Sequence, residues 1–360
     1  MKAKSLEDLR EKLRQIDQEI VRLFNERAQM SQEIGRFKQE NKIDVYDPAQ
    51  EARVFRYLAE LNNGPLPEAS LKTIFREIIS TSRALQKPIE VAYFGLEASF
   101  THLAAKSHFG EATHYISQPQ IGRVFTAVEK GEVDWGVVPR ENSLEGSVNL
   151  TLDQLFSTTL KIRAEIFLRI SHCLISAEES LDDIKKVYSH PQALAQCQRW
   201  LRENLPQAMV TAVESTSAAA KMVSEEKNAA AIGSLLAAQT YGLKIISKGI
   251  EDYPMNVTRF FVIGRGDTQA TGKDKTSIMF GTPNVPGALY HALKSFAERG
   301  LNMSKIESYP TKGSPWEFVF FVDVEGHQTD DEVRLCLDEM RTKSSLYKIL
   351  GSYPRGEEVL

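Results

Sequence analysis

The sequence has little cysteine, no long apolar run and almost no excess of charge of either sign. Its three cysteines are Cys173, Cys197 and Cys336, and they lie far apart without forming a CxxC pair. This pattern predicts reduced thiols and excludes a disulfide framework or a zinc knuckle. No apolar segment approaches the roughly 18 residues of a transmembrane helix. We therefore expect a cytoplasmic protein that does not enter a membrane.

The charged residues are nearly balanced along the chain. It has 44 Lys and Arg against 48 Asp and Glu, a net charge of −4, which gives no support to a nucleic-acid or acidic-membrane partner. The seven histidines show no HExxH or other paired metal spacing, so no metal site is expected. Residues 1–87, however, carry 16 Lys and Arg against 14 Asp and Glu, a local charge of +2. That block could therefore serve small anions.

The length predicts more than one domain. A chain of 360 residues exceeds what one hydrophobic core usually organises. The pattern along the chain predicts an all-α block at 1–87, an α/β block at 88–266 and an α+β block at 276–356. A polar stretch without periodicity, Gly266–Lys275, separates the last two. The fold class is thus multidomain.

The first block is predicted to consist of three helices. Apolar residues recur every three or four positions along its first part, at Leu6, Leu9, Leu13, Ile16, Ile20, Leu23, Met30, Ile34 and Phe37. Ser5 is the expected N-cap of this long helix, and Asp47-Pro48 opens a second one. Asn63-Gly64-Pro65 ends the second helix, and a third is expected over about 68–86. Because the first helix is too long for a compact monomer, we expect an intertwined helical dimer.

The remaining blocks contain strands. Short apolar strands such as 89–94 and 133–139 alternate with Ala-rich helices up to residue 264, as in an α/β domain. The last block is predicted as strand 277–280, helix 287–299, strands 303–309 and 316–324, helix 330–343 and strand 347–353. That βαββαβ order is the ferredoxin-like arrangement of many small-ligand regulatory domains.

Two cations occupy the apolar stripe of the first helix or lie close to it. Arg27 falls on the stripe, and Lys38 lies about 16 Å further along nearly the same face. An arginine there needs a compensating anion, because burying an unpaired charge is costly. One explanation is an internal salt bridge. The other is a polar pocket for a small anion, which Ser82 and Gln86 on one face of the third helix would complete.

The first block resembles the all-helical chorismate mutases. The resemblance rests on Leu9–Leu13, Glu26-Arg27, Gly35–Lys38, Val45–Pro48 and Ser82 with Gln86. It implies that Arg10 and Arg27 clamp the two carboxylates of chorismate, that Lys38 and Gln86 hydrogen-bond its ether oxygen, and that Asp47, Glu51 and Ser82 orient the ring. The implied reaction is a pericyclic rearrangement that requires no cofactor. The family usually has arginine where this chain has Gln50.

The spacing of the two arginines adds a prediction about assembly. Arg10 lies about 25 Å from Arg27 along a straight helix. Both can reach one ligand only if Arg10 comes from a second chain. The active mutase is therefore expected to be a homodimer or a higher homo-oligomer.

The middle block resembles prephenate dehydratase. The resemblance is carried by Val138–Ser143 with Gly146, Ser189–Gln192 with Gln196, Glu214–Ser217 and Asn256–Phe260. It implies two lobes like those of periplasmic binding proteins, with prephenate between them. The implied roles are assistance to hydroxyl departure by Thr258, carboxylate pairing by Arg259, and substrate positioning by Asn142, Ser189, Gln196 and Ser217. Glu141 could be an acid at this site or a structural residue. Arg140 stands where the family usually has an apolar residue.

The last block resembles the ACT regulatory domain of prephenate dehydratases. Asn284–Leu289 and Leu301–Ser308 carry this resemblance. It implies that phenylalanine is an effector and that the binding residues are Gly287, Ala288, Leu289, Asn302, Glu307 and Ser308. The family's arginine after Glu-Ser is Tyr309 here.

Taken together, the resemblances imply a bifunctional chorismate mutase/prephenate dehydratase in phenylalanine biosynthesis, regulated by phenylalanine and free of cofactors. Two alternatives stay open. In one, the middle block acts on arogenate, although no acidic residue can be assigned to its ammonium group. In the other, the chain is a non-catalytic small-molecule sensor, against which Thr258–Phe260 argues.

Overall fold

The computed structural model describes residues 5–283, 285–310 and 318–357. The first block has three helices, α1 (Leu6–Glu40), α2 (Pro48–Leu61) and α3 (Glu68–Gln86). As predicted, Ser5 caps α1: its Oγ accepts from the Asp8 N–H at 3.1 Å, and its own N–H donates to Asp8 Oδ2 at 3.2 Å. Asp47 caps α2 by accepting from the Gln50 N–H at 3.0 Å, and Pro48 lies in the first turn.

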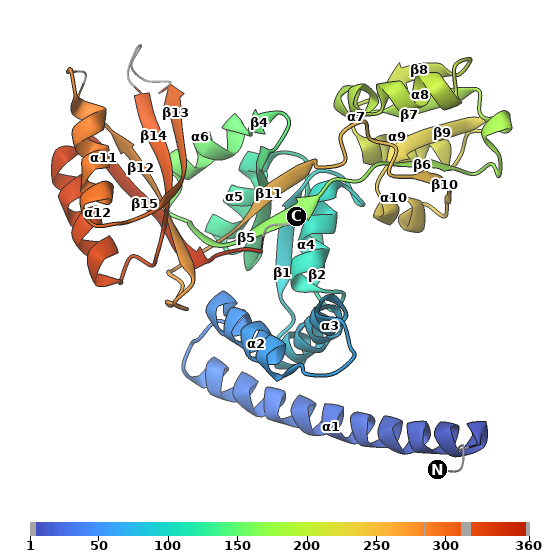
Figure 1. The fold of residues 1–360 in the computed structure, drawn as a ribbon, viewed down its shortest axis with the longest axis horizontal. Helices are drawn as coiled ribbons and strands as arrows, with labels where there is room; N and C mark the ends of the chain where they lie inside the picture. The colour runs from blue at the N-terminus through green and yellow to red at the C-terminus, as the bar shows by residue number, and fades with distance from the viewer. Residues whose placement is uncertain (1–4, 284, 311–317, 358–360) are drawn as a thin grey trace.

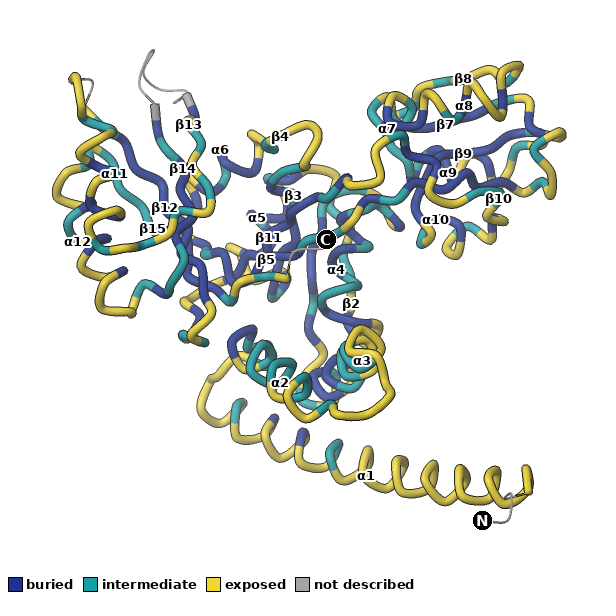
Figure 2. Tube along the Cα trace, viewed as in Figure 1, coloured by how far each residue is buried: buried dark blue, intermediate teal, exposed yellow. Residues whose placement is uncertain are grey.

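Helix α1 lies along the outside of the molecule and packs on α3 through its C-terminal half (Figure 1). Its N-terminal half is exposed all round (Figure 2). The apolar stripe predicted from the sequence is therefore uncovered in the single chain. Leu9 is 49% exposed, Leu13 58% and Ile16 55%.

The middle block forms two lobes. The first lobe has a sheet in the order β2-β1-β3-β11-β5, with β4 paired to β3. Its strands are β1 (Glu90–Phe94), β2 (His114–Gln118), β3 (Trp135–Asn142), β4 (Gly146–Ser147), β5 (Lys161–Arg169) and β11 (Val257–Gly264). Its helices are α4 (Phe100–Phe109), α5 (Ile121–Lys130) and α6 (Asn149–Ser157). Strand β11 runs antiparallel between β3 and β5 and returns the chain from the second lobe.

The second lobe has a sheet in the order β10-β6-β9-β7-β8. Its strands are β6 (Cys173–Ser176), β7 (Lys186–Ser189), β8 (Met209–Ala212), β9 (Ala229–Gly233) and β10 (Lys244–Lys248). Its helices are η1 (Leu181–Asp183), α7 (Pro191–Gln196), α8 (Gln198–Asn204), α9 (Thr216–Val223) and α10 (Leu235–Thr240). The two segments that join the lobes run side by side, because the Ile170 N–H donates to the Asn256 carbonyl at 2.8 Å and the Ile250 N–H to the His172 carbonyl at 3.1 Å.

The C-terminal domain confirms the predicted βαββαβ order. Its elements are β12 (Asp274–Gly281), α11 (Ala288–Glu298), β13 (Met303–Pro310), β14 (Phe318–Glu325), α12 (Asp331–Lys343) and β15 (Leu346–Pro354). The sheet order is β13-β14-β12-β15. Asp274 and Lys275 were expected in the linker but are buried in β12, so the linker is shorter than predicted. Trp316 and Asn284 lie outside the described residues.

The C-terminal domain and the first lobe share one hydrophobic core. Phe261 of β11 lies against Phe321 of β14 and Tyr353 of β15, with ring centroids 6.5 and 6.2 Å apart. Strand β15 also passes so close to β5 that a Cβ on Gly351 would lie 2.2 Å from the Ile162 carbonyl oxygen. Within the described residues, no helix is long and apolar enough to cross a membrane.

Candidate active sites

The N-terminal helices bring several predicted chorismate-binding residues together. Arg27 on α1 donates from Nη1 to Ser82 Oγ on α3. Lys38, near the end of α1, donates from Nζ to the Val45 carbonyl at 2.8 Å. Burial lowers the pKa of both cations, and for Lys38 nearby carboxylates oppose this effect. Two half-buried cations thus lie on one side of α1, as an anion site requires.

The carboxylates of this cluster come from α2. Asp47 and Glu51 are near enough to Lys38 to raise its pKa by their charge. Glu51 also forms an ion pair with Arg83 on α3, whose Nη1 lies 2.9 Å from Glu51 Oε1. Burial raises the pKa of Glu51, and Arg83 opposes that rise. Arg83 also donates to the Phe109 carbonyl in the first lobe, so the cluster is braced by the neighbouring domain.

Of the two remaining predicted residues, Gln86 lies beside this cluster and Arg10 lies away from it. Gln86 lies where α3 crosses α1 at Gly35; a Cβ on Gly35 would be 2.9 Å from Gln86 Cα, so glycine permits this close approach. The Oε1 atom of Gln86 is buried without a hydrogen-bond partner among the described residues. Arg10 is exposed on the free half of α1, and the structure does not bring it to the others. Gln50, which stands where the family usually has arginine, is exposed. The guanidinium that pairs with the neighbouring Glu51 belongs to Arg83.

A chain of hydrogen bonds connects the two lobes of the middle block. Asn142 Nδ2 donates to Thr258 Oγ1 at 2.8 Å and to Asn256 Oδ1 at 2.6 Å. Asn256 Nδ2 donates to Gln196 Oε1 at 3.1 Å, and His172 Nε2 lies 2.9 Å from the same oxygen. Predicted residues from β3, β11 and α7 therefore meet where the chain passes between the lobes.

Arg259 and Glu141 lie on the other face of the sheet, away from Thr258. Side chains alternate along β11, so Arg259 points away from Thr258 and toward the C-terminal domain. Its guanidinium is 3% exposed and pairs with Asp323 and Glu165, each at 2.6 Å. Glu141 accepts from Arg259 at 3.3 Å and from Lys305. Both residues are saturated by protein partners.

A β-bulge explains this arrangement. The pairing of β3 with β11 skips Arg140, since Arg259 pairs with Glu141 and Phe260 with Pro139. A bulge re-aims side chains, and here Arg140 and Glu141 both contact the C-terminal domain. The pKa of Glu141 is lowered. Burial alone would raise it, but the positive charges of Lys305, Arg140 and Arg259 outweigh that effect.

The two predicted serines of the second lobe differ. Ser189 Oγ donates to the Ile232 carbonyl at 2.8 Å, so its proton is engaged. Ser217, in the first turn of α9, is fully buried, and its Oγ has no hydrogen-bond partner among the described residues. The sequence interpretation missed His172 and Glu145, which contact opposite ends of the Gln196 amide. Neither position carries a sequence signal that distinguishes it from an ordinary polar residue.

The predicted effector residues lie on two elements of the C-terminal domain. Gly287, Ala288 and Leu289 form the start of α11, and Gly287 has the left-handed φ of 80° that glycine tolerates. Asn302 precedes β13, while Glu307 and Ser308 lie on β13, at the edge of the sheet. Glu307 pairs with Arg140 of the first lobe, as described below. The Tyr309 hydroxyl donates to Asp153, also in the first lobe.

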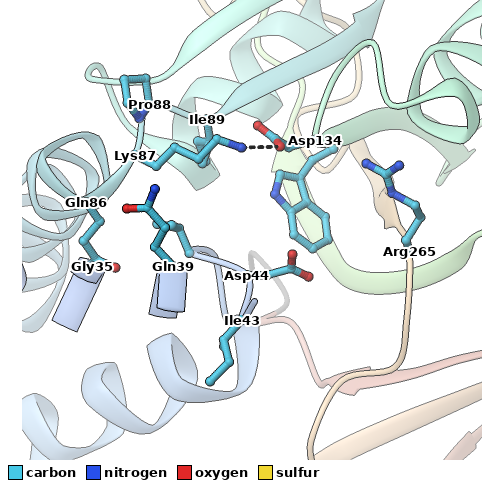
Figure 3. Close-up of a pocket in the computed structure, with 12 residues that line it drawn as sticks. Gly35, Gln39, Ile43, Asp44, Gln86, Lys87, Pro88, Ile89, Asp134 and Arg265 are labelled. Atoms are coloured by element: carbon cyan, nitrogen blue, oxygen red, sulfur yellow. Dashed lines mark hydrogen bonds and ion pairs between the residues drawn. The ribbon is translucent and has the colours of Figure 1, made fainter. Parts of the chain in front are cut away.

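A separate cavity of about 360 Å³ lies between the helical block and the first lobe (Figure 3). Of the predicted site residues, it contains Gln86. Lys87 and Asp134 form an ion pair in its wall at 3.4 Å. Arg265 adds a positive charge to the lining and Asp44 a negative one. This cavity is therefore balanced in charge and is distinct from the Thr258 cluster. In the described part of the chain, no group of three or more His, Cys, Asp or Glu side chains could hold a metal ion.

Comparison with known families divides the chain into three parts. Residues 9–87 match chorismate mutase type II, residues 91–268 match prephenate dehydratase, and residues 276–339 match the ACT domain. A bifunctional chorismate mutase/prephenate dehydratase from Aquifex aeolicus (strain VF5) is 45% identical over 354 residues, which cover 97% of this chain and 98% of the relative.

Two solved structures resemble the middle and C-terminal parts. Prephenate dehydratase from Arthrobacter aurescens in complex with L-Phe has a TM-score of 0.69 and 35% identity, and the match covers 74% of this chain and 90% of that one. GqqA, described as a novel type of quorum-quenching acylase, has a TM-score of 0.68 and 32% identity, with 74% and 97% covered.

Proposed function

Because the chain belongs to the bifunctional chorismate mutase/prephenate dehydratases, we propose that it works through two separate sites, one in the helical block and one between the lobes. It converts chorismate to prephenate and prephenate to phenylpyruvate, in phenylalanine biosynthesis. The observation that carries this conclusion is similarity along the whole chain, helical block included.

At the mutase site, positioning and charge supply the catalysis. Arg27 holds one carboxylate of chorismate, and Arg10 of a second chain holds the other, since arginine is suited to bidentate pairing. Lys38 and the amide of Gln86 donate to the ether oxygen as the C–O bond breaks. Asp47, Glu51 and Ser82 orient the ring. These donors stabilise the negative charge that develops in a reaction that needs no nucleophile.

The exposed stripe on α1 supports a dimer at this site. Leu13 and Ile16 expose more than half of their surface, although they lie on the apolar face of an amphipathic helix. A second α1 packed on this stripe would cover them and would bring its Arg10 toward Arg27, about 25 Å away along the helix. We propose a homodimer or a higher homo-oligomer.

At the dehydratase site, Thr258 is proposed to assist the departure of the ring hydroxyl. Asn142 donates to Thr258 Oγ1 at 2.8 Å, which leaves the Thr258 proton free to be donated to the leaving oxygen. The C–O bond and the bond to the ring carboxylate break, the ring becomes aromatic, carbon dioxide leaves, and the departing hydroxyl takes up one proton from solvent to leave as water. A threonine hydroxyl is a weak acid, so hydrogen-bond polarisation is its main contribution.

The remaining polar groups position the substrate. Ser217 has a free buried hydroxyl near the start of α9, where helix N–H groups favour a carboxylate. Gln196 and Ser189 are the other second-lobe residues that we propose to position the substrate. We propose no role in substrate binding for Arg259 or Glu141, because protein groups already satisfy both.

The C-terminal domain is proposed to bind phenylalanine. An ACT domain is present, and the related prephenate dehydratase was solved in complex with L-Phe. The start of α11 and the edge strand β13 carry the expected effector residues, and an edge strand can pair with a second chain. We place the domain boundaries at 1–87 and 88–266, and the C-terminal domain begins with β12 at Asp274. A cytoplasmic location fits the three buried free cysteines.

The test supplies chorismate to the purified chain and measures chorismate, prephenate and phenylpyruvate over time. We expect both conversions in the wild type. Thr258→Ala should accumulate prephenate, whereas Thr211→Ala, a matched change on β8, should behave as wild type. Full dehydratase activity in Thr258→Ala would remove Thr258 from its role. Unchanged chorismate would refute the mutase activity, and conversion of arogenate but not prephenate would favour that alternative.

A further inference from the structure

The active-site residue Asn142 stands at the end of a very short hairpin. Strand β3 ends at Asn142, and the returning strand β4 has only two residues, Gly146 and Ser147. Pairing is limited to Glu141 with Ser147 and Asn142 with Gly146. A two-stranded ladder of this length is too short to hold itself in water. Asn142 is also held by the pairing of β3 with β11, so side-chain contacts matter most for β4 and the turn that leads to it.

The tip of this hairpin carries much of the dehydratase cluster. Asn142 Oδ1 accepts from the Leu144 and Glu145 N–H groups at 3.0 and 3.2 Å, which directs its Nδ2 to Thr258. Glu145 Oε1 accepts from Gln196 Nε2 at 3.2 Å, across to the second lobe. A shift of the hairpin would therefore move the group that polarises Thr258 and a contact between the lobes.

The base of the hairpin is held by the C-terminal domain. Glu307 Oε2 on β13 accepts from Arg140 Nη2 at 2.8 Å and from Ser147 Oγ at 2.6 Å. Arg140 Nη1 also lies 2.9 Å from Ser147 Oγ, so the three side chains form a closed triangle across β3, β4 and β13. Arg140 is fully buried, and its guanidinium lies 4.4 Å from the centre of the Phe321 ring.

This triangle differs from an ordinary surface ion pair. The pKa of Glu307 is lowered. Burial alone would raise it, but the hydrogen bonds from Arg140 and Ser147 outweigh that effect. Because Arg140 has no exposure, its charge needs compensation, and Glu307 is the carboxylate that pairs with it directly. The bulge that turns Arg140 toward β13 lies two residues before Asn142.

We propose that Glu307 is a positioning residue for the dehydratase reaction: through Arg140 and Ser147 it fixes β4 and the turn whose N–H groups orient the Asn142 amide toward Thr258. The inference rests on the proposed dehydratase function. It means that a carboxylate of the C-terminal domain belongs to the support of the active site in the first lobe.

The experiment compares Glu307→Ala, Glu307→Gln and the double variant Arg140→Leu/Glu307→Leu in the full chain. Glu307→Ala should lower dehydratase kcat about tenfold or more, as small displacements of reacting groups do, while mutase activity on the same chain is unchanged. Glu307→Gln keeps an acceptor for both partners and should retain most of kcat. Glu325→Ala, which removes an exposed ion pair with Arg355 on the same domain, is the matched control.

The double variant separates positioning from stability. Replacing both charges by apolar groups relieves the buried uncompensated arginine, so the thermal midpoint should recover relative to Glu307→Ala. Dehydratase kcat should stay low, because the anchor is still missing. Recovery of both quantities, or wild-type kcat in Glu307→Ala, would overturn the proposal. Absence of dehydratase activity in the wild-type chain would instead refute the proposed function, before any variant is compared.

Discussion

The two arginines on α1 allow a direct test of a site shared between chains. In Arg10→Ala or Arg27→Ala, one carboxylate of chorismate loses its partner. A charge-assisted hydrogen bond contributes about 1.5–3 kcal/mol, so a bidentate pair lost at the site should lower mutase kcat/KM by about 100-fold or more. Dehydratase activity should be unchanged in both variants, because neither arginine lies near Thr258.

Mixing the two variants should restore activity. In a twofold dimer of one Arg10→Ala chain and one Arg27→Ala chain, one site has both arginines and the other has neither. Random exchange makes half of the dimers mixed, so about a quarter of wild-type mutase activity should return. The proposed interface would be substantial: covering the exposed part of Leu9, Leu13, Ile16, Ile20 and Leu23 would contribute about 1 kcal/mol per side chain on each helix.

The assay follows chorismate loss after the variants are mixed, incubated to exchange chains and checked for dimers by sedimentation. Leu13→Glu in both partners is a further control, because a charge on the stripe should prevent pairing of α1 and abolish the recovery. If mixed dimers form and no activity returns, the two arginines do not act on one substrate. If Arg10→Ala alone is fully active, the shared site is refuted.

Three further predictions concern stability. Arg259→Met should destabilise the fold by about 3–5 kcal/mol, because it leaves the buried Asp323 carboxylate unpaired; loss of dehydratase activity with an unchanged thermal midpoint would instead restore a substrate role. Burial lowers the pKa of His102 from 6.5 to about 4, so the folded state binds its proton more weakly than the unfolded state. Stability should therefore fall as pH drops from 6.5 to 4, by up to about 1.4 kcal/mol per unit. His102→Gln should reduce that slope in urea unfolding at several pH values, and the remainder belongs partly to His108 and His172, whose pKa values burial also lowers. Gly351→Ala should lower the thermal midpoint, since its Cβ would lie 2.2 Å from the Ile162 carbonyl oxygen, and a wild-type midpoint would contradict this close approach.

Local signals predicted much of the fold. Ser5 and Asp47 are caps that act within one helical turn, and the structure uses both. The βαββαβ order of the C-terminal domain follows from strands and helices of ordinary length. The linker was overestimated because Asp274 and Lys275 are polar residues in a strand, and Lys275 is buried against Glu165, which is far away in sequence.

The candidate sites were predictable only in part. The motifs place Asn142 and Thr258 in one cluster, and the structure joins them by a hydrogen bond. The resemblance assigned Arg259 to the substrate together with Thr258, although the period of two in a strand places neighbouring side chains on opposite faces. The position of Arg140 had no such signal. Its bulge arises from pairing with a strand almost 120 residues away.

The core shared by the first lobe and the C-terminal domain has a consequence for how the molecule unfolds. Val138, Phe261, Phe321 and Tyr353 belong to one buried cluster, although the linker at 266–273 divides them in sequence. Cooperative unfolding follows packing rather than family boundaries. The catalytic lobe and the ACT domain should therefore lose their slowest-exchanging amide protons in a single event. A chain cut at the linker would expose half of a core instead of releasing an intact module.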